Sequence, residues 1–304
     1  IAHLYEKVPA ENIMTLTPEE GIFICMQTLI KAGDHVISLF PAYQSLYEIA
    51  RSRGCKVTPW LLKAGDNAWE LDFDELEGSL QEDTRLLVIN FPHNPTGFLP
   101  RLSELQRIVD FARAHHLYLF SDEMYRFLEY DPAKRLPPIC DLYEKGISLS
   151  GLSKSFALLG LRTGWLATQD ERLFHTWALY KDYTTICSSA PSEVLALAAL
   201  RARPDITARN IKIIKSNLAV ANPFFERFKE QFNWLPPQAG SIAFPHLNLP
   251  ISIDEFCEQF IKCKDVMLVP AAMFDLPGNH FRIGLGRKNF AEALGLLGDF
   301  LVGI

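Results

Sequence analysis

The 304-residue sequence has no apolar run close to the roughly 20 residues that a membrane-spanning helix requires, and its longest candidates, such as residues 193–200, suit a buried helix. A dense block of Lys and Arg is also missing, since 30 basic residues against 36 acidic ones leave a net charge of −6. The electrostatic footprint of a nucleic-acid binder is therefore absent. These features predict neither nucleic acid nor a membrane as a partner.

Paired cysteines are missing as well. The six cysteines are scattered without a Cys-x-x-Cys pair, and a chain of this length can bury a core without disulfides. Neither the cysteine nor the histidine spacing suggests zinc, so no metal site is predicted. Reduced thiols are typical of a cytoplasmic protein, which is the location we expect. The chain begins at Ile1 rather than Met, and we expect that a preceding segment is absent from this sequence.

Short apolar runs alternate with helix-like periods through most of the chain, and its length suggests about two domains. Strands are predicted at residues 35–40, 56–61, 86–91, 117–121, 147–149 and 163–167, and helices at 19–31, 43–53, 72–80, 103–115 and 171–183. The run from Leu86 to Ile89 is apolar throughout, which suits a strand buried on both faces. The alternation predicts an α/β fold with a mostly parallel central sheet and helices on both faces.

The pattern changes after about residue 192. A helical region over 191–231, broken near Pro204, leads to a loop at Pro236, Pro237 and Gly240. Shorter elements follow, with strands at 241–247, 266–269 and 280–285 and helices at 253–263 and 290–302. We therefore expect a large domain over residues 1–203 and a smaller C-terminal α+β domain over 204–304.

Polar residues follow four of the predicted strands, namely Tyr43, Asn94, Asp122 and Lys154. In a parallel α/β sheet, ligands bind beyond the carboxyl ends of the strands. These side chains are therefore predicted to converge on one pocket. The spacing by itself does not identify the ligand.

The local sequences around these positions are more specific. They read Asn94-Pro95-Thr96-Gly97, Asp122-Glu123-Met124-Tyr125, Ser153-Lys154 and Gly160-x-Arg162-x-Gly164. Each motif alone is weak, but the ordered set, from about Thr15 to Arg282, resembles the class I/II aminotransferases of pyridoxal-phosphate (PLP) fold type I. The resemblance implies the large domain of that fold and pyridoxal 5'-phosphate as the cofactor.

The resemblance assigns the catalytic chemistry to two of these residues. Lys154 is expected to bond covalently to PLP, because a desolvated amine is a good nucleophile for a carbonyl. Asp122 is expected to pair with the protonated ring nitrogen, which lets the ring act as an electron sink. A lysine in a loop is more commonly just exposed, and an aspartate after a strand is commonly a helix N-cap. For Asp122 both descriptions can hold together.

The remaining cofactor and substrate contacts are also implied by the resemblance. Asn94 and Tyr125 are expected to form hydrogen bonds with the phenolic oxygen of the PLP ring. Tyr43 is expected to stack on that ring, a contact that contributes about 1 kcal/mol to binding. Arg162 is expected to bind the phosphate, and Arg282 the substrate α-carboxylate, with Asn94 beside the substrate. The alternatives are a turn-forming asparagine, core aromatics, and a surface arginine on an edge strand.

The helix start Thr17-Pro18-Glu19-Glu20 lies where the family places further phosphate contacts. Backbone N–H groups at a helix N-terminus bind anions, but Pro18 has no N–H. The Thr17 hydroxyl and the Glu19 amide are the predicted contacts here. The alternative is an ordinary helix start, with a Thr cap and Pro in the first turn.

A second departure is Gly151, where the family often has Ser or Thr three residues before the lysine. Ser153 or Ser150 is expected to replace that hydroxyl, or the contact is missing. This leaves the completion of the phosphate site open without affecting the cofactor class.

The predicted activity is transamination between an amino acid and a 2-oxo acid, in a homodimer as is usual for the family. A lyase, a cyclising synthase or an oxidase can use the same residues, because the later fate of the carbanion varies. A PLP-sensing effector domain of a transcription regulator is a third possibility. Residues 181–189, where some members carry a second arginine, have none, which weakly disfavours aspartate or glutamate as the donor.

Overall fold

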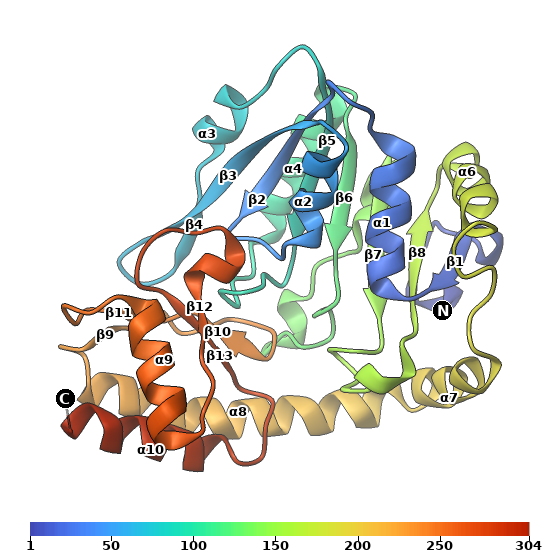
Figure 1. Ribbon diagram of the computed structural model, residues 1–304. Coiled ribbons are helices and arrows are strands. Elements are labelled where there is room, and N and C mark those ends of the chain that lie inside the picture. The colour runs from blue at the N-terminus through green and yellow to red at the C-terminus, as the bar shows by residue number, and fades with distance from the viewer. Residues whose placement is uncertain (304) are drawn as a thin grey trace.

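A computed structural model describes residues 1–303 of the chain. Eight strands form one large sheet in the order β1-β8-β7-β6-β5-β2-β3-β4 (Figure 1). Its parallel part contains β2 (His35–Phe40), β3 (Lys56–Ala64), β5 (Thr84–Asn90), β6 (Tyr118–Asp122) and β7 (Gly146–Gly151). The antiparallel strands are β1 (Ile13–Leu16), β4 (Trp69–Leu71) and β8 (Gly164–Thr168).

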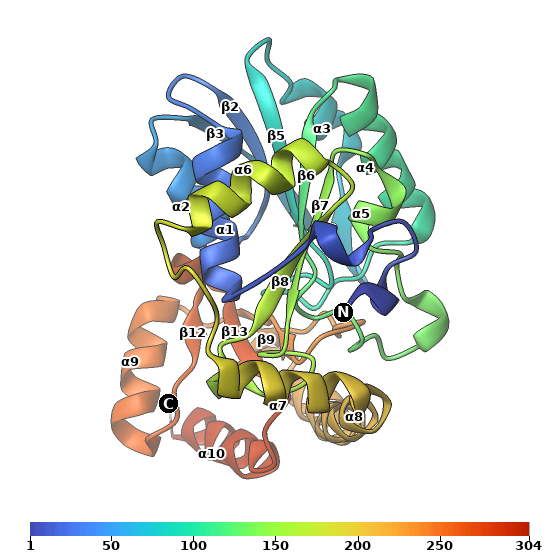
Figure 2. The same cartoon turned by 90° about the vertical axis from the view of Figure 1, so that its right-hand side faces the viewer.

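Helices cover both faces of this sheet (Figure 2). One face packs on α3 (Phe73–Gly78), α4 (Leu102–Ala114) and α5 (Ile139–Leu142). The other face packs on α1 (Pro18–Leu29), α2 (Ser45–Ser52) and α6 (Glu171–Lys181). Alternate residues of β5 point to opposite faces of the sheet. Leu87 and Ile89 pack on the side of α3, α4 and α5, and Leu86 and Val88 pack on the side of α1, α2 and α6. The predicted α/β fold, with a mostly parallel sheet covered on both faces, is confirmed.

A smaller C-terminal unit follows two consecutive helices, α7 (Ala190–Arg201) and α8 (Arg203–Arg227), which meet next to Pro204 as predicted. The unit contains a sheet of β10 (Ile242–Ala243), β13 (Phe281–Gly284) and β12 (Val269–Pro270), and a pair formed by β9 (Phe232–Asn233) and β11 (His246–Leu247). The helices α9 (Ile253–Lys264) and α10 (Phe290–Val302) pack on it.

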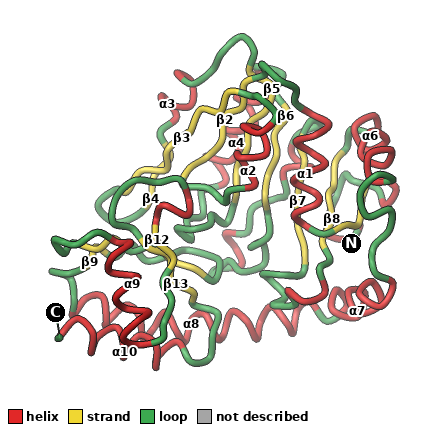
Figure 3. Tube along the Cα trace, in the orientation of Figure 1, coloured by secondary structure: helices red, strands yellow, loops and turns green. Residues whose placement is uncertain are grey.

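The sequence reading misses β1, β4, β9 and α5, because elements of two to four residues have no readable periodicity. It also places a strand at 266–269, whereas β12 begins only at Val269. In Figure 3, loops at the carboxyl ends of the parallel strands lie between the large sheet and the small unit. These loops carry Tyr43, Asn94 and Lys154, and Asp122 is the last residue of β6.

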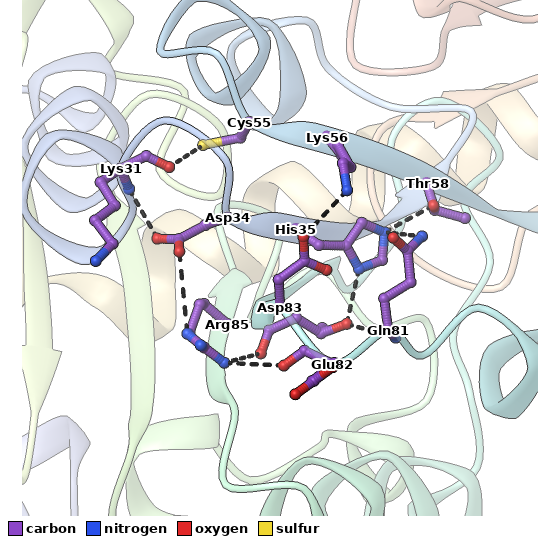
Figure 4. A network of polar contacts seen from close by, with 11 residues as sticks. Lys31, Asp34, His35, Cys55, Lys56, Thr58, Gln81, Glu82, Asp83 and Arg85 are labelled. Carbon is purple, nitrogen blue, oxygen red and sulfur yellow. Dashed lines mark hydrogen bonds and ion pairs between the residues drawn. The ribbon is translucent and has the colours of Figure 1, made fainter.

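The opposite, amino-terminal edge of the sheet holds a separate polar network (Figure 4). The buried ring of His35 bonds the hydroxyls of Thr84 and Thr58, each at 2.7 Å, and the Gln81 amide at 3.2 Å. Burial lowers the pKa of His35. Both ring nitrogens are satisfied within the protein, as buried polar groups require. The network ties together the amino-terminal ends of β2, β3 and β5.

Candidate active site

One pocket beyond the carboxyl ends of the parallel strands collects nearly all of the predicted site residues. It measures about 820 Å³, including the part open to solvent. Its lining includes nine of the predicted residues, namely Glu19, Tyr43, Asn94, Asp122, Tyr125, Ser153, Lys154, Arg162 and Arg282. Thr17 lies outside it and lines a neighbouring pocket that shares Arg162 as a wall.

The two proposed catalytic groups have shifted pKa values. Burial raises the pKa of the Asp122 carboxyl to about 6, although the Met124 N–H donates to its Oδ1 at 3.0 Å. Partial burial, and then the positive charge of Arg282, lowers the pKa of Lys154. Each shift favours the neutral form, as expected of charged groups that lack a close counter-ion. A cation bound next to Asp122 would therefore stabilise its charged form. Lys154 loses its proton more readily than an exposed lysine does.

The substrate side of the pocket joins two segments that are far apart in the sequence. The Nη1 group of Arg282, on β13, donates to Oδ1 of Asn94 at 3.0 Å. The Asn94 backbone N–H is itself held by Oδ1 of Asn90, at the end of β5, at 2.7 Å. Tyr125 is buried, which raises its pKa to about 12, so its hydroxyl stays protonated near neutral pH. This group can donate a hydrogen bond to an oxygen in the pocket.

The departures at Pro18 and Gly151 are one packing feature. A Cβ atom on Gly151 would lie 3.0 Å from Cγ of Pro18 and 3.0 Å from Cα of Gly164. A Cβ atom on Gly164 would lie only 2.7 Å from the same proline ring atom. The ring thus occupies the space that a serine or threonine at position 151 would need. The sequence showed both departures but not that the Pro18 ring lies against position 151.

The acidic residues in the first turn of α1 have separate partners. The Glu19 carboxylate lies in the pocket wall and accepts hydrogen bonds from the hydroxyls of Tyr43, at 3.2 Å, and Ser45. The Thr17 hydroxyl is the N-cap, accepting from the backbone N–H of Glu20 at 3.3 Å. Glu19 was expected to act through its amide, whereas here its side chain also faces the pocket.

Glu20, the next acidic residue of this turn, has partners that the sequence did not indicate. Its buried carboxylate accepts hydrogen bonds from the Lys181 ammonium at 3.3 Å, from the Thr184 hydroxyl at 2.6 Å and from the Thr185 hydroxyl at 2.7 Å. These donors outweigh the cost of burial, so the pKa of Glu20 is lowered. The contacts tie the loop after α6 to the start of α1. No local pattern could reveal them, because the partners are more than 160 residues apart.

Comparison with known proteins identifies the family. The sequence model for aminotransferase class I and II matches residues 1–294. The chain belongs to the class I and II aminotransferase family.

Relatives agree with this assignment. An aromatic-amino-acid aminotransferase of Thermococcus litoralis is 28% identical, with 94% of this chain and 73% of that protein covered. Capreomycidine synthase of Streptomyces vinaceus is 27% identical, with coverages of 91% and 70%. The crystal structure of a PLP-dependent aminotransferase from Streptococcus suis superimposes with a TM-score of 0.92 at 30% identity, covering 99% of this chain and 80% of that one.

The protein is therefore a PLP-dependent aminotransferase, with the type I fold, that moves an amino group between an amino acid and a 2-oxo acid. Its pocket fits the cofactor on structural grounds. The Ser153 hydroxyl is buried and has no hydrogen-bond partner among the described residues, so it can donate to a phosphate oxygen. The buried Asp122 carboxylate suits a protonated ring nitrogen, because that cation would compensate its burial.

Proposed function

We propose that the transamination takes place in the pocket around Lys154 and that the nine lining residues named above hold PLP and the amino acid. The observation that carries the proposal is the convergence of an amine, a buried carboxylate and two arginines from separate loops on one cavity. A cavity that brings such groups together, with shifted pKa values at Asp122 and Lys154, is typical of an active site.

When bound, PLP supplies an electron sink for the bond that breaks at the substrate Cα. Lys154 would hold the cofactor covalently, and its amine would serve as general base for the Cα proton of the substrate, a role that its lowered pKa supports. Asp122 would keep a proton on the ring nitrogen, and Arg162 and Ser153 would hold the phosphate. Arg282 grips the α-carboxylate bidentately, which fixes the Cα–H bond relative to Lys154.

A visible absorption spectrum, taken before and after addition of each of twenty amino acids, tests the proposal. The wild-type holoenzyme should show a band from bound cofactor that shifts with its donor, and 2-oxo acid should be released. Lys154→Ala should lose the covalent band and the reaction. Lys145→Ala is the matched control, because Lys145 precedes the other end of β7, where its ammonium donates to the His116 carbonyl and lies over the Tyr118 ring. A Lys154→Ala variant with full turnover would show that the base lies elsewhere.

A second reaction on the same cofactor is favoured by one relative, the capreomycidine synthase at 27% identity. The same residues could release ammonia or close a ring after the Cα proton leaves, because the electron sink serves each of these paths. The measurement that separates the two is the product. Conversion of the cofactor to its amine form with stoichiometric 2-oxo acid supports transamination, whereas ammonia, peroxide or a cyclic product supports the alternative.

We also propose that the protein works as a homodimer. Large apolar side chains are exposed on the segment after α6 and on α7, which lie on the same side of the molecule (Figure 2). Tyr183 is 90% exposed, Ile186 67%, and Val194, Leu195 and Leu197 at least half. A patch of this kind is unusual for a monomer and suits burial against a second copy. Sedimentation should give about twice 34.5 kDa, and Val194→Glu should favour the monomer.

Two coarser assignments complete the proposal. Among residues 1–303, no helix combines the length and apolarity needed to cross a membrane. We propose a cytoplasmic location, which cell fractionation tests.

We also propose a division into residues 1–203 and 204–304, supported by the start of α8 at Arg203. Limited proteolysis should then cut first near this junction.

A further inference from the structure

Arg282 is the arginine that the proposed function assigns to the substrate, and it needs a fixed orientation. Among residues 1–303 it makes no ion pair with a carboxylate. Two other groups contact its guanidinium: Oδ1 of Asn94 accepts from Nη1 at 3.0 Å, and the Phe274 ring centroid lies 5.1 Å from Cζ. A cation held over an aromatic ring keeps its charge available for a carboxylate, which an ion pair within the protein would not.

The Phe274 ring is itself fixed. Phe274 ends the short helix η5 (Ala271–Phe274), which follows β12, and β12 pairs with β13 so that Val269 lies opposite Arg282. The ring is buried and packs edge-on against Phe244, with centroids 5.7 Å apart at 83°. Because the ring fits between Phe244 and the guanidinium, it supports Arg282 from the side facing the protein.

The segment is also fastened to the large sheet, toward which it rises in Figure 1. The Phe274 carbonyl accepts from the backbone N–H of Ala42, which adjoins the pocket residue Tyr43, at 3.3 Å. The next residue, Asp275, accepts from Nη1 of Arg51 on α2 at 2.9 Å, although Arg51 also pairs with Glu48 within α2. These contacts join the end of η5, which packs against Arg282, to the loop that carries Tyr43 and to α2.

We propose that Phe274 and Asp275 are positioning residues for substrate carboxylate recognition by Arg282. Asp275 holds the end of η5 against Arg51, and the neighbouring Phe274 ring thereby keeps a fixed position under the Arg282 guanidinium. A bidentate carboxylate grip tolerates little misalignment, so loosening either residue weakens binding of the α-carboxylate more than binding of the rest of the substrate. The inference rests on the proposed function and adds two residues to it.

The test measures dissociation constants by absorbance titration of the holoenzyme, not turnover. The ligands are the L-amino acid that gives the largest spectral change in the wild type and the amine that lacks its carboxylate. Asp275→Asn should weaken the amino acid about two- to fivefold, the range of a half-exposed ion pair, and Phe274→Leu about tenfold. The amine should bind all variants alike. Glu48→Gln, which removes the other partner of Arg51, should leave both constants unchanged.

Three outcomes would overturn the inference. Either Asp275→Asn and Phe274→Leu leave the amino-acid constant unchanged, or both weaken amine and amino acid equally, or Glu48→Gln reproduces the effect of Asp275→Asn. If Phe274→Leu lowers the melting temperature severely, the half-exposed Asp275→Asn decides alone. A wild-type holoenzyme that responds to no amino acid would instead refute the proposed function, so the two failures are distinguishable.

Discussion

Asp122→Asn should stabilise the apoprotein while it impairs cofactor function. The pKa of Asp122 rises from its usual 3.8 to about 6, mainly through burial. A difference of about two pH units corresponds to about 3 kcal/mol of unfolding free energy at pH 8. The folded state binds the Asp122 proton more tightly than the unfolded state does. The stability that this proton contributes is therefore fully present below pH 3.8 and is lost as pH rises through about 6. Asparagine carries no charge and keeps an oxygen for the Met124 N–H.

The assay is urea unfolding of cofactor-free wild type and variant at pH 8 and pH 4, at equal protein concentration. The variant should be more stable by about 3 kcal/mol at pH 8 and by well under 1 kcal/mol at pH 4. With cofactor added, the advantage should shrink at pH 8, because the ring nitrogen's positive charge compensates the aspartate but not the asparagine.

A buried aspartate elsewhere is the matched control. Asp141 accepts the backbone N–H groups of Glu6 and Lys7 at 3.0 and 2.9 Å, so its charge is satisfied in the folded state. Asp141→Asn should therefore destabilise at pH 8, by roughly 1–3 kcal/mol. Equal destabilisation by both variants would refute the reasoning, since it would mean that the Asp122 charge is already compensated in the cofactor-free protein.

Three further predictions follow from the site. Lys154→Ala should lower the rate of the amino-acid half-reaction by at least about a thousandfold, measured by stopped-flow absorbance, because the general base is lost. Gly151→Ser should cost roughly 1–3 kcal/mol in urea unfolding, and Pro18→Gly should recover part of that cost in the double variant, because the proline ring would no longer clash. Glu20→Gln should cost about 2 kcal/mol at pH 7 by removing the charge that faces Lys181. The pKa of Glu20 is lowered, so this cost should vanish as pH falls through its folded-state pKa; a cost independent of pH would argue against the ion pair.

The sequence was sufficient for the α/β class and for the location of the pocket. The reason is that both are local. The strand over β5 is recognisable as a buried apolar run. Asp122 is the last residue of β6, and Asn94 and Lys154 follow the ends of β5 and β7 within a few residues. Parallel strands place such residues at one edge without further information. Short antiparallel additions such as β1 and β4 depend on pairing with distant strands, which periodicity cannot reveal.

Only the tertiary structure decided how the site is supported. The contact between Arg282 and Asn94 joins residues 188 positions apart, and the Phe274 ring behind Arg282 belongs to no motif. The crowding of position 151 by the Pro18 ring, which leaves little room for a side chain there, likewise depends on how two separate segments pack. Sequence patterns determined which chemistry is present, because reactive groups are read locally. Packing determined their orientation and pKa, because burial and distance exist only after the chain has folded.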